Sequence, residues 1–466
     1  MPTRLLAAYI ASFFVAQAAQ AGQAVERLNG VEAIARLECR AINKSDQPQD
    51  FTVSFALPLS NARQDVYALF CQEGAAAIET DRYGNRIATY AAKAVPPGEV
   101  RRFGWIAGVS LYAAVWHPTG ERRALPEEER AHYLRDLPVY QIGAPIITRL
   151  RDALTRPDMR DVEKARAFFD HVSTHIDYVR DGRWDPAPEV LERNIGSCSE
   201  YSYALIALLR ASGIPCRYSG SANLTQANRT KYDPRTHEDT VYHRWAEIHL
   251  KDYGWFPVDG SRGHSARLRF DNVANYWGRL PAGQLETYQG DGGDDVALGW
   301  DYIANGHCAQ KNALHTATVC VWVEGRTGDL QADIARVRTA LDAADSAEAF
   351  AAILKEPLDR EIALWLFPSI EAVRLPALAG GLAAVRHPEA VYVAAYCERA
   401  GIALPPELAS SALADKAFVT ELLKRVSRAP KAWSAFEHWW RKARPLVVYS
   451  EKKKAFELTA AGIDLN

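Results

Sequence analysis

Residues 196–200 read Gly-Ser-Cys-Ser-Glu, and the apolar residues after them recur at helical spacing as far as residue 212. Ser197 and Glu200 fit a capping box, in which two side chains satisfy free backbone N–H groups at a helix start. Cys198 is then the first helical residue, where the unpaired N–H groups and the helix dipole favour an anion. We therefore expect a capped helix and a Cys198 thiol with a lowered pKa. On this segment alone, an inert cysteine in an ordinary helix is the alternative.

A second segment predicts a β-hairpin that carries a histidine and an aspartate. Residues 243–250 (His-Arg-Trp-Ala-Glu-Ile-His-Leu) and 255–259 (Trp-Phe-Pro-Val-Asp) flank a turn that ends in Gly254. The odd-numbered side chains of the first strand should share one face, while its even-numbered apolar side chains point into the core. A three-residue loop pairs residue 250 with residue 254 and places His243 diagonal to Asp259 on the same face.

These residue types together predict a catalytic triad. A thiolate at a helix start, a histidine that exchanges its proton and a carboxylate that orients the imidazole are a nucleophile, a base and an orienting group. We therefore predict that Cys198, His243 and Asp259 are catalytic. The alternatives for the last two are an ordinary strand histidine and a turn residue before Gly260.

The same segments resemble the consecutive signatures of the bacterial transglutaminase-like superfamily over about residues 125–305. The resemblance rests on Gly196-x-Cys198, Leu209-Arg210-Ala211-x-Gly213-Ile214-Pro215-x-Arg217, His243-x-Trp245-x-Glu247 and Gly254-Trp255-x-Pro257-x-Asp259. It also includes an approach helix that ends in Ile176-Asp177-Tyr178. The resemblance implies a papain-like α+β core, with Cys198 on the central helix and the other two triad residues on the sheet, and thiol chemistry on an amide.

Two positions depart from this family. Glutamine-crosslinking eukaryotic members typically carry Trp after the cysteine, whereas this chain has Ser199, so animal-type crosslinking gains no support. Many members read Asp-Pro at the carboxylate, whereas Gly260 follows Asp259 here, which predicts a different exit from the strand. The acidic run at residues 291–295 lacks the ligand spacing of an EF-hand and is interpreted as a solvated loop.

Composition and motifs exclude several other functions. The chain of 466 residues has 55 Lys and Arg against 57 Asp and Glu, a formal charge of −2, so no overall field favours nucleic acid. It contains no C-x-x-C, no H-E-x-x-H and no closely spaced Cys/His quartet, so we expect neither a metal nor another cofactor. The expected partner is a protein, peptide or envelope-polymer substrate.

The first 21 residues have the pattern of a cleavable signal peptide. Arg4 precedes an apolar stretch at residues 5–16, and Ala-Gln-Ala at residues 19–21 fits a signal peptidase site. We expect a mature start at Gly22 and a periplasmic or secreted protein, and no later run is long enough for a spanning helix. An N-terminal helix packed on the core is the alternative.

Export would place seven cysteines in an oxidising compartment, where an odd number leaves at least one thiol free. By proximity in the sequence, Cys39 could pair with Cys71 and Cys308 with Cys320, but the connectivity stays open. A catalytic Cys198 would have to remain reduced.

The remaining patterns divide the chain into three domains after the signal peptide. Alternation of apolar residues between positions 31 and 116 predicts an antiparallel β-sandwich at residues 22–117. The catalytic domain is expected at residues 118–325 and a helical domain at 326–466, where Leu330, Ile334, Val337 and Leu341 share one helical face. The expected class is thus a multi-domain protein with a sandwich, an α+β core and a helical C-terminus.

The function that fits these predictions is an exported, cysteine-dependent enzyme acting on amide or peptide bonds through an acyl-thioester. Hydrolysis is favoured over transfer to an amine, because nothing in the sequence identifies a site that binds an amine and excludes water. The alternative is a catalytically idle module that acts as a scaffold for a protein or envelope polymer.

Overall fold

The computed structural model describes most of the chain between residues 24 and 404 and two short strands near its end. The described ranges are residues 24–72, 74–97, 99–119, 124–230, 233–268, 276–291, 298, 303–310, 313–385, 387, 389–390, 393–394, 397, 402–404, 447–450 and 455–458. The predicted signal peptide at residues 1–21 lies outside them, as does most of the acidic run at 291–295.

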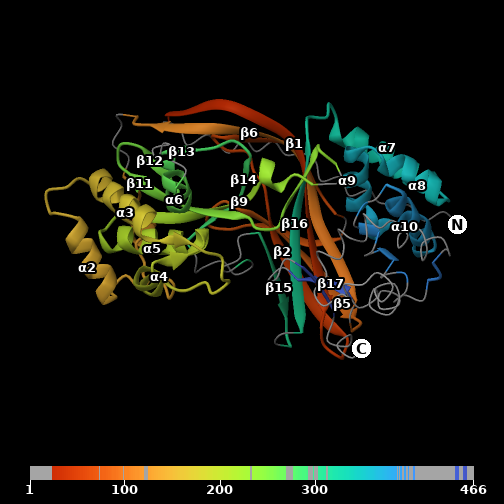
Figure 1. Ribbon diagram of the computed structural model, residues 1–466, viewed down its shortest axis with the longest axis horizontal. Helices are drawn as coiled ribbons and strands as arrows, with labels where there is room; N and C mark the ends of the chain where they lie inside the picture. The colour runs from red at the N-terminus through yellow and green to blue at the C-terminus, as the bar shows by residue number, and fades with distance from the viewer. Residues whose placement is uncertain are drawn as a thin grey trace.

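Two antiparallel sheets occupy the middle of the elongated molecule (Figure 1). The larger sheet has the order β10-β16-β1-β6-β13, with β3 also paired to β6. Its strands are β1 (Ala24–Asn43), β3 (Gln64–Cys71), β6 (Val100–His117), β10 (Thr236–Asp239), β13 (Arg279–Leu280) and β16 (Leu314–Glu324). The smaller sheet, of order β15-β2-β5-β4, consists of β2 (Gln49–Leu57), β4 (Ala75–Thr80), β5 (Arg86–Val95) and β15 (Ala304–Cys308).

Side chains of these two sheets pack in one core. The ring of Tyr90 on β5 lies 5.2 Å from that of Phe103 on β6, and the indole N–H of Trp105 donates to the carbonyl of Ala56. Strands from residues 236–324 complete both sheets, so residues 22–117 do not build them alone. The division of the chain into three domains therefore stays a prediction.

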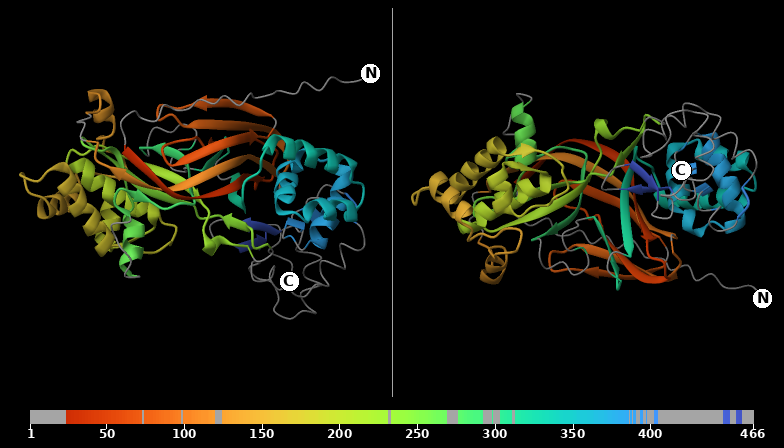
Figure 2. Two further views of the ribbon diagram at one scale, coloured as in Figure 1. Left: turned by 90° about the horizontal axis from the view of Figure 1, so that it is seen from above. Right: turned by 60° about the horizontal axis from the view of Figure 1, so that its bottom comes forward.

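The middle of the larger sheet is buried on both faces. Ala33, Ala35 and Leu37 of β1 belong to the core shared with the smaller sheet, whereas Ile34 belongs to a second core beneath the C-terminal helices. Alternate side chains of a strand point to opposite faces, so β1 serves both cores. Figure 2 shows the C-terminal helices against one end of the sheets.

The C-terminal region contains helices that begin soon after β16. They are α7 (Leu330–Ala343), α8 (Ala347–Leu354), α9 (Pro357–Trp365) and α10 (Leu375–Ala384), with short 3-10 turns at Phe367–Ser369 and Ala372–Arg374. The predicted apolar face of α7 is confirmed, because Leu330, Ile334, Val337 and Leu341 are all buried. A final hairpin joins β17 (Val447–Ser450) and β18 (Ala455–Leu458), and residues 405–446 are outside the described part.

The α+β part of the chain lies at the opposite end of the molecule, as Figure 1 shows. Its helices are α1 (Glu127–His132), α2 (Pro145–Leu154), α3 (Asp161–His175), α4 (Ala187–Arg193), α5 (Cys198–Ala211) and α6 (Gly260–Leu268). Its sheet, of order β12-β11-β9-β14, contains β9 (Cys216–Asn223), β11 (His243–Leu250), β12 (Gly254–Val258) and β14 (Gln284–Gly290). A short turn at Gln226–Asn228 follows β9. Residues 198–210 of α5 are buried, so this helix is the centre of the fold.

The predicted hairpin register is confirmed, because Leu250 pairs with Gly254. The expectation that only one face of β11 points into a core is wrong. Trp245 and Glu247, on the other face, are 1% and 6% exposed. Arg217 on β9 forms an ion pair with Glu247, and Arg63, from the turn before β3, lies over the Trp245 ring. The N-terminal strands thus cover a face that the local sequence pattern left open.

All seven cysteines lie in described residues, and none of them forms a disulfide bond with another. The suggested pairs Cys39–Cys71 and Cys308–Cys320 are therefore absent from the structure. Cys39 on β1 pairs with Phe103 of β6, and Cys71 on β3 pairs with Trp105 of β6. Strand β6 therefore lies between the strands that carry these two cysteines. Cys308 and Cys320 lie in different sheets.

Removing the Glu200 carboxylate should destabilise the start of α5. Its two oxygens accept hydrogen bonds from the backbone N–H groups of Ser197 (2.7 Å) and Asp185 (3.1 Å), and the residue is 1% exposed. Glu200→Ala leaves both donors buried without this acceptor, so we expect a loss of about 2–4 kcal/mol in urea unfolding. Glu200→Gln, which keeps one acceptor oxygen, should lose less; an unchanged free energy of unfolding in Glu200→Ala would show that the carboxylate does not hold the helix start.

Candidate active site

Cys198 lies at the first position of α5, as the capping residues predict. Ser197 is the N-cap in an extended conformation, and the Glu200 side chain returns to its backbone N–H. The short strand β8 (Ile195–Gly196) leads into this turn. Cys198 is 6% exposed, so its thiol lies at the positive end of a buried helix.

The structure brings His243 and Asp259 to this helix start. The Nε2 atom of His243 lies 2.6 Å from Oδ2 of Asp259, and His243 also shares a hydrogen bond with the Cys198 thiol. Since Nε2 faces the carboxylate, Nδ1 is the ring nitrogen left to face the sulfur. The three residues predicted from the sequence therefore form one connected group, in the order thiol, imidazole, carboxylate.

Asp259 also begins the next helix. Its Oδ1 accepts hydrogen bonds from the Ser261 hydroxyl (2.9 Å) and from the Arg262 backbone N–H (3.0 Å), as an N-cap aspartate does. Gly260 is the first residue of α6, and a Cβ there would lie 3.1 Å from Val172 on α3. The departure at Gly260 is thus accommodated by a helix that starts directly after the carboxylate and packs closely on α3.

Arg262 is a site residue that sequence reasoning missed. Its Nε lies 3.3 Å from Nε2 of His243 and 3.4 Å from Oδ2 of Asp259, and its side chain is 27% exposed. Its position in the first turn after Asp259 was the available signal, because that turn surrounds the capping carboxylate. The guanidinium favours the ionised carboxylate and opposes the protonation of the imidazole.

Charge at the triad favours a thiolate beside an imidazolium. Burial alone would raise the pKa of the Cys198 thiol, but the hydrogen bond and the charge of His243 lower it below the usual value. Burial, the largest single influence, lowers the pKa of His243, but the charge and hydrogen bond of Asp259 together with the interaction with Cys198 raise this pKa to about 9. Burial likewise opposes ionisation of Asp259, yet the charge and hydrogen bond of His243 hold its pKa below the usual value.

Two further groups act on the Cys198 thiol. The backbone N–H and the charge of Arg244, the residue after His243, both help to lower the pKa of the thiol. Tyr178, on the short strand β7 (Asp177–Tyr178), also interacts with the thiol, and this interaction helps to raise the pKa of its phenol. The Arg244 guanidinium in turn donates to the hydroxyl of Tyr203 on α5 at 2.7 Å, which ties β11 to the central helix. The sulfur thus lies among groups that stabilise negative charge.

The rate of alkylation of Cys198 should rise at a lower pH than that of an ordinary cysteine. We expect iodoacetamide to label Cys198 at pH values below the usual thiol midpoint of about 8.5, because a lowered thiol pKa keeps the thiolate present there. His243→Ala should move this rise to higher pH. Amide cleavage should fall as the pH rises through about 9, where His243 loses the proton that a leaving amine needs. A labelling profile that His243→Ala leaves unchanged would contradict the ion pair.

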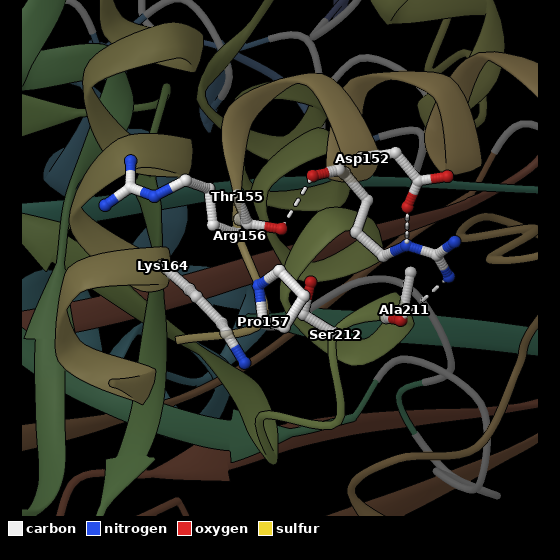
Figure 3. Close-up of a pocket in the computed structure, with 8 residues that line it drawn as sticks. Asp152, Thr155, Arg156, Pro157, Lys164, Ala211 and Ser212 are labelled. Carbon is white, nitrogen blue, oxygen red and sulfur yellow. Dashed lines mark hydrogen bonds and ion pairs between the residues drawn. The ribbon is translucent and has the colours of Figure 1, made fainter. Parts of the chain in front are cut away.

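The cavity in Figure 3 lies at the opposite end of α5. It measures about 420 Å³ and is lined by Arg151, Asp152, Thr155, Arg156, Pro157, Lys164, Ala211 and Ser212. At about 1.5 Å per residue, the length of α5 puts it roughly 20 Å from Cys198. Its lining contains none of Cys198, His243 and Asp259, so the cavity is separate from the candidate site.

The described residues contain neither a cluster suited to a metal ion nor a helix suited to crossing a membrane. Among them, no cluster of three or more His, Cys, Asp or Glu side chains is arranged to hold a metal ion. No helix in the described ranges is both long and apolar enough to cross a membrane.

Comparison with known proteins places the triad in a family domain. Residues 148–260 match the model of the transglutaminase-like superfamily, so this part of the chain is a transglutaminase-like domain. Cys198, His243 and Asp259 all fall within the match. The resemblance inferred from the sequence is thereby confirmed. No curated protein matches the chain.

Solved structures similar to this chain include proteins described as proteases. A candidate cysteine protease from Cytophaga hutchinsonii is 14% identical over 66% of this chain and 94% of its own, with a TM-score of 0.43. The periplasmic domain of TgpA from Pseudomonas aeruginosa is 18% identical over 52% of this chain and 75% of its own, with a TM-score of 0.29. A candidate protease from Parabacteroides distasonis is 13% identical over 52% and 44%, with a TM-score of 0.20.

Proposed function

We propose that this protein is a cysteine-dependent enzyme that cleaves amide or peptide bonds through an acyl-thioester on Cys198. The observation that carries the proposal is the connected group of Cys198, His243 and Asp259 at the start of a buried helix. A thiol that is only structural needs neither a paired imidazole nor a lowered pKa.

The arrangement supports a two-step reaction. The Cys198 thiolate attacks the substrate carbonyl, and its backbone N–H at the helix start donates to the oxygen that becomes negative. The imidazolium of His243 then protonates the leaving amine, and the C–N bond breaks to give a thioester. In the second step the neutral imidazole takes a proton from water as its oxygen attacks the thioester carbonyl. The C–S bond then breaks, which releases the carboxylic acid and restores the Cys198 thiolate beside the imidazolium. Asp259 holds the ring orientation and stabilises its positive form throughout.

We propose hydrolysis rather than transfer to an amine as the natural outcome. Water is present at about 55 M, so transfer needs a site that binds the amine and excludes solvent. Ser199 occupies the position at which crosslinking members carry Trp, and it is buried in α5 rather than exposed to a second substrate.

Partition of the acyl-enzyme tests this proposal. Wild-type protein should cleave a peptide or amide substrate, Cys198→Ala should not, and millimolar primary amine should capture little of the product. Diversion of most acyl groups into a stable amide would make transfer the natural reaction. Failure of the wild-type thiol to become acylated at all would favour the idle scaffold instead.

We further propose that the enzyme acts outside the cytoplasm, in the periplasm or after secretion. The support is the signal-peptide pattern of residues 1–21. The intact mass of the exported product should correspond to a chain that begins at Gly22. Retention of the first 21 residues would contradict this localisation.

A further inference from the structure

Acyl transfer at Cys198 needs a second hydrogen-bond donor for the oxyanion. The backbone N–H at the start of α5 supplies one donor, but preorganised sites for acyl transfer generally use two. The oxygen of a carbonyl bonded to sulfur lies within about 3 Å of that sulfur, so a second donor has to lie close to the Cys198 Sγ.

Tyr178 is held in such a place by backbone pairing. The strand β7 pairs in parallel with β8, and Tyr178 lies opposite Gly196, two residues before Cys198. The next residue, Val179, donates its backbone N–H to the carbonyl of Gly196 at 3.0 Å. The Tyr178 ring also packs near that of Tyr201 on α5, with centroids 6.2 Å apart. These contacts fix the phenol beside the helix start.

The Tyr178 hydroxyl interacts with the Cys198 thiol and stays protonated. Burial and the negative charge of the Cys198 thiolate both raise the pKa of this phenol, so it keeps its proton next to the thiolate. Tyr178 is nevertheless 38% exposed, and the next residue, Val179, is 41% exposed. The phenol therefore lies where the protected thiol meets the surface from which a substrate must arrive.

We propose that the Tyr178 hydroxyl is the second oxyanion donor of this active site. The inference rests on the proposed function. As the Sγ–C bond forms, the π electrons of the carbonyl move to its oxygen, and negative charge leaves the sulfur. The Tyr178 hydroxyl then donates its hydrogen bond to the oxyanion instead of the sulfur, and its proton stays on the phenol. When the oxyanion collapses, the C–N bond breaks and the amine takes its proton from His243.

The residues that follow His243 on β11 are buried, with Arg244 0% and Trp245 1% exposed, so neither lies on the exposed side of the site. The Arg244 guanidinium donates to the Tyr203 hydroxyl and lies over the Tyr218 ring, 4.0 Å from its centroid. The Trp245 ring stacks beside the imidazole, 6.2 Å from its centroid, and is covered by Arg63. Tyr178 is the side chain that combines contact with the sulfur and exposure to the substrate side.

Two reactions of the Cys198 sulfur distinguish oxyanion donation by Tyr178 from simple stabilisation of the thiolate. Acylation by p-nitrophenyl acetate passes through an oxyanion, whereas alkylation by iodoacetamide does not. Both rates would be measured on the full chain at a pH where the thiolate is fully formed. Tyr178→Phe should slow acylation by about 10²-fold, the usual effect of losing one oxyanion donor, and change alkylation by less than about threefold.

Tyr201→Phe is the matched control, because it removes a neighbouring phenol whose partner is the carbonyl of Ile176. It should leave the ratio of the two rates unchanged. Equal slowing of acylation and alkylation in Tyr178→Phe would overturn the proposal and leave the phenol a thiolate-stabilising group. Unchanged acylation would also overturn it. A wild-type thiol that is alkylated but never acylated would instead refute the proposed enzyme function, and the Tyr178 role with it.

Discussion

Cys198→Ala should abolish the release of p-nitrophenol from p-nitrophenyl acetate, a loss of about 10⁴-fold or more. The sulfur is the atom that forms the thioester, and no other group at the triad can replace it as nucleophile. The measurement is the rate of p-nitrophenol release per mole of folded protein, with circular dichroism to confirm folding.

Cys216→Ala is the matched control for this loss. Cys216 is also a free, fully buried cysteine of the same domain, but burial raises the pKa of its thiol to about 11. It should be neither acylated nor alkylated, and its removal should leave the rate within about twofold, because no triad atom is changed. Activity that survives Cys198→Ala and disappears with Cys216→Ala would contradict the assignment of the nucleophile.

Asp259→Asn should lower acylation by about 10²–10⁴-fold, because a carboxamide cannot stabilise the imidazolium and permits the wrong tautomer of His243. Asparagine is also a good N-cap, so it can still accept the hydrogen bonds of Ser261 and Arg262 that begin α6. Stability should therefore change little while the reaction slows.

His243→Ala provides the comparison, with a loss at least as large as that of Asp259→Asn because it removes the acid and base itself. Urea unfolding of both variants separates catalysis from folding. An Asp259→Asn variant that reacts at the wild-type rate would show that Asp259 acts only as the cap of α6.

The local parts of the site were predictable from the sequence. The capping box at residues 197–200 placed Cys198 at the helix start, and the three-residue turn fixed the pairing of Leu250 with Gly254. Both features depend on residues a few positions apart, whose spacing determines which groups meet. The approach of His243 to Asp259 follows from that hairpin register.

Parts of the fold that depend on distant segments were not predictable. β16 pairs with β1 although nearly 300 residues separate them, and no local pattern specifies such a partner. For the same reason Glu247 could not be recognised as buried, because Arg217 and the N-terminal strands enclose it. The sequence pattern reports which side chains alternate, and long-range packing decides which of them are covered.

The position of Tyr178 beside the Cys198 thiol is another feature that depends on distant segments and was not predictable. The sequence identified residue 178 only as the end of an approach helix, whereas the structure ends α3 at His175 and continues as β7. The parallel pairing of β7 with β8 brings Tyr178 to Cys198, twenty positions further along the chain. Arg262 was missed for a more local reason, since the helix that begins at Gly260 had not been predicted.

Mapping the acyl group by mass spectrometry after rapid acid quench tests the central claim most directly. Wild-type protein mixed with p-nitrophenyl acetate should carry one acetyl group, removable by hydroxylamine, on the peptide that contains Cys198, and His243→Ala should accumulate far less of it. An acetyl group found on another residue, or none on Cys198 while the protein remains folded, would contradict the account.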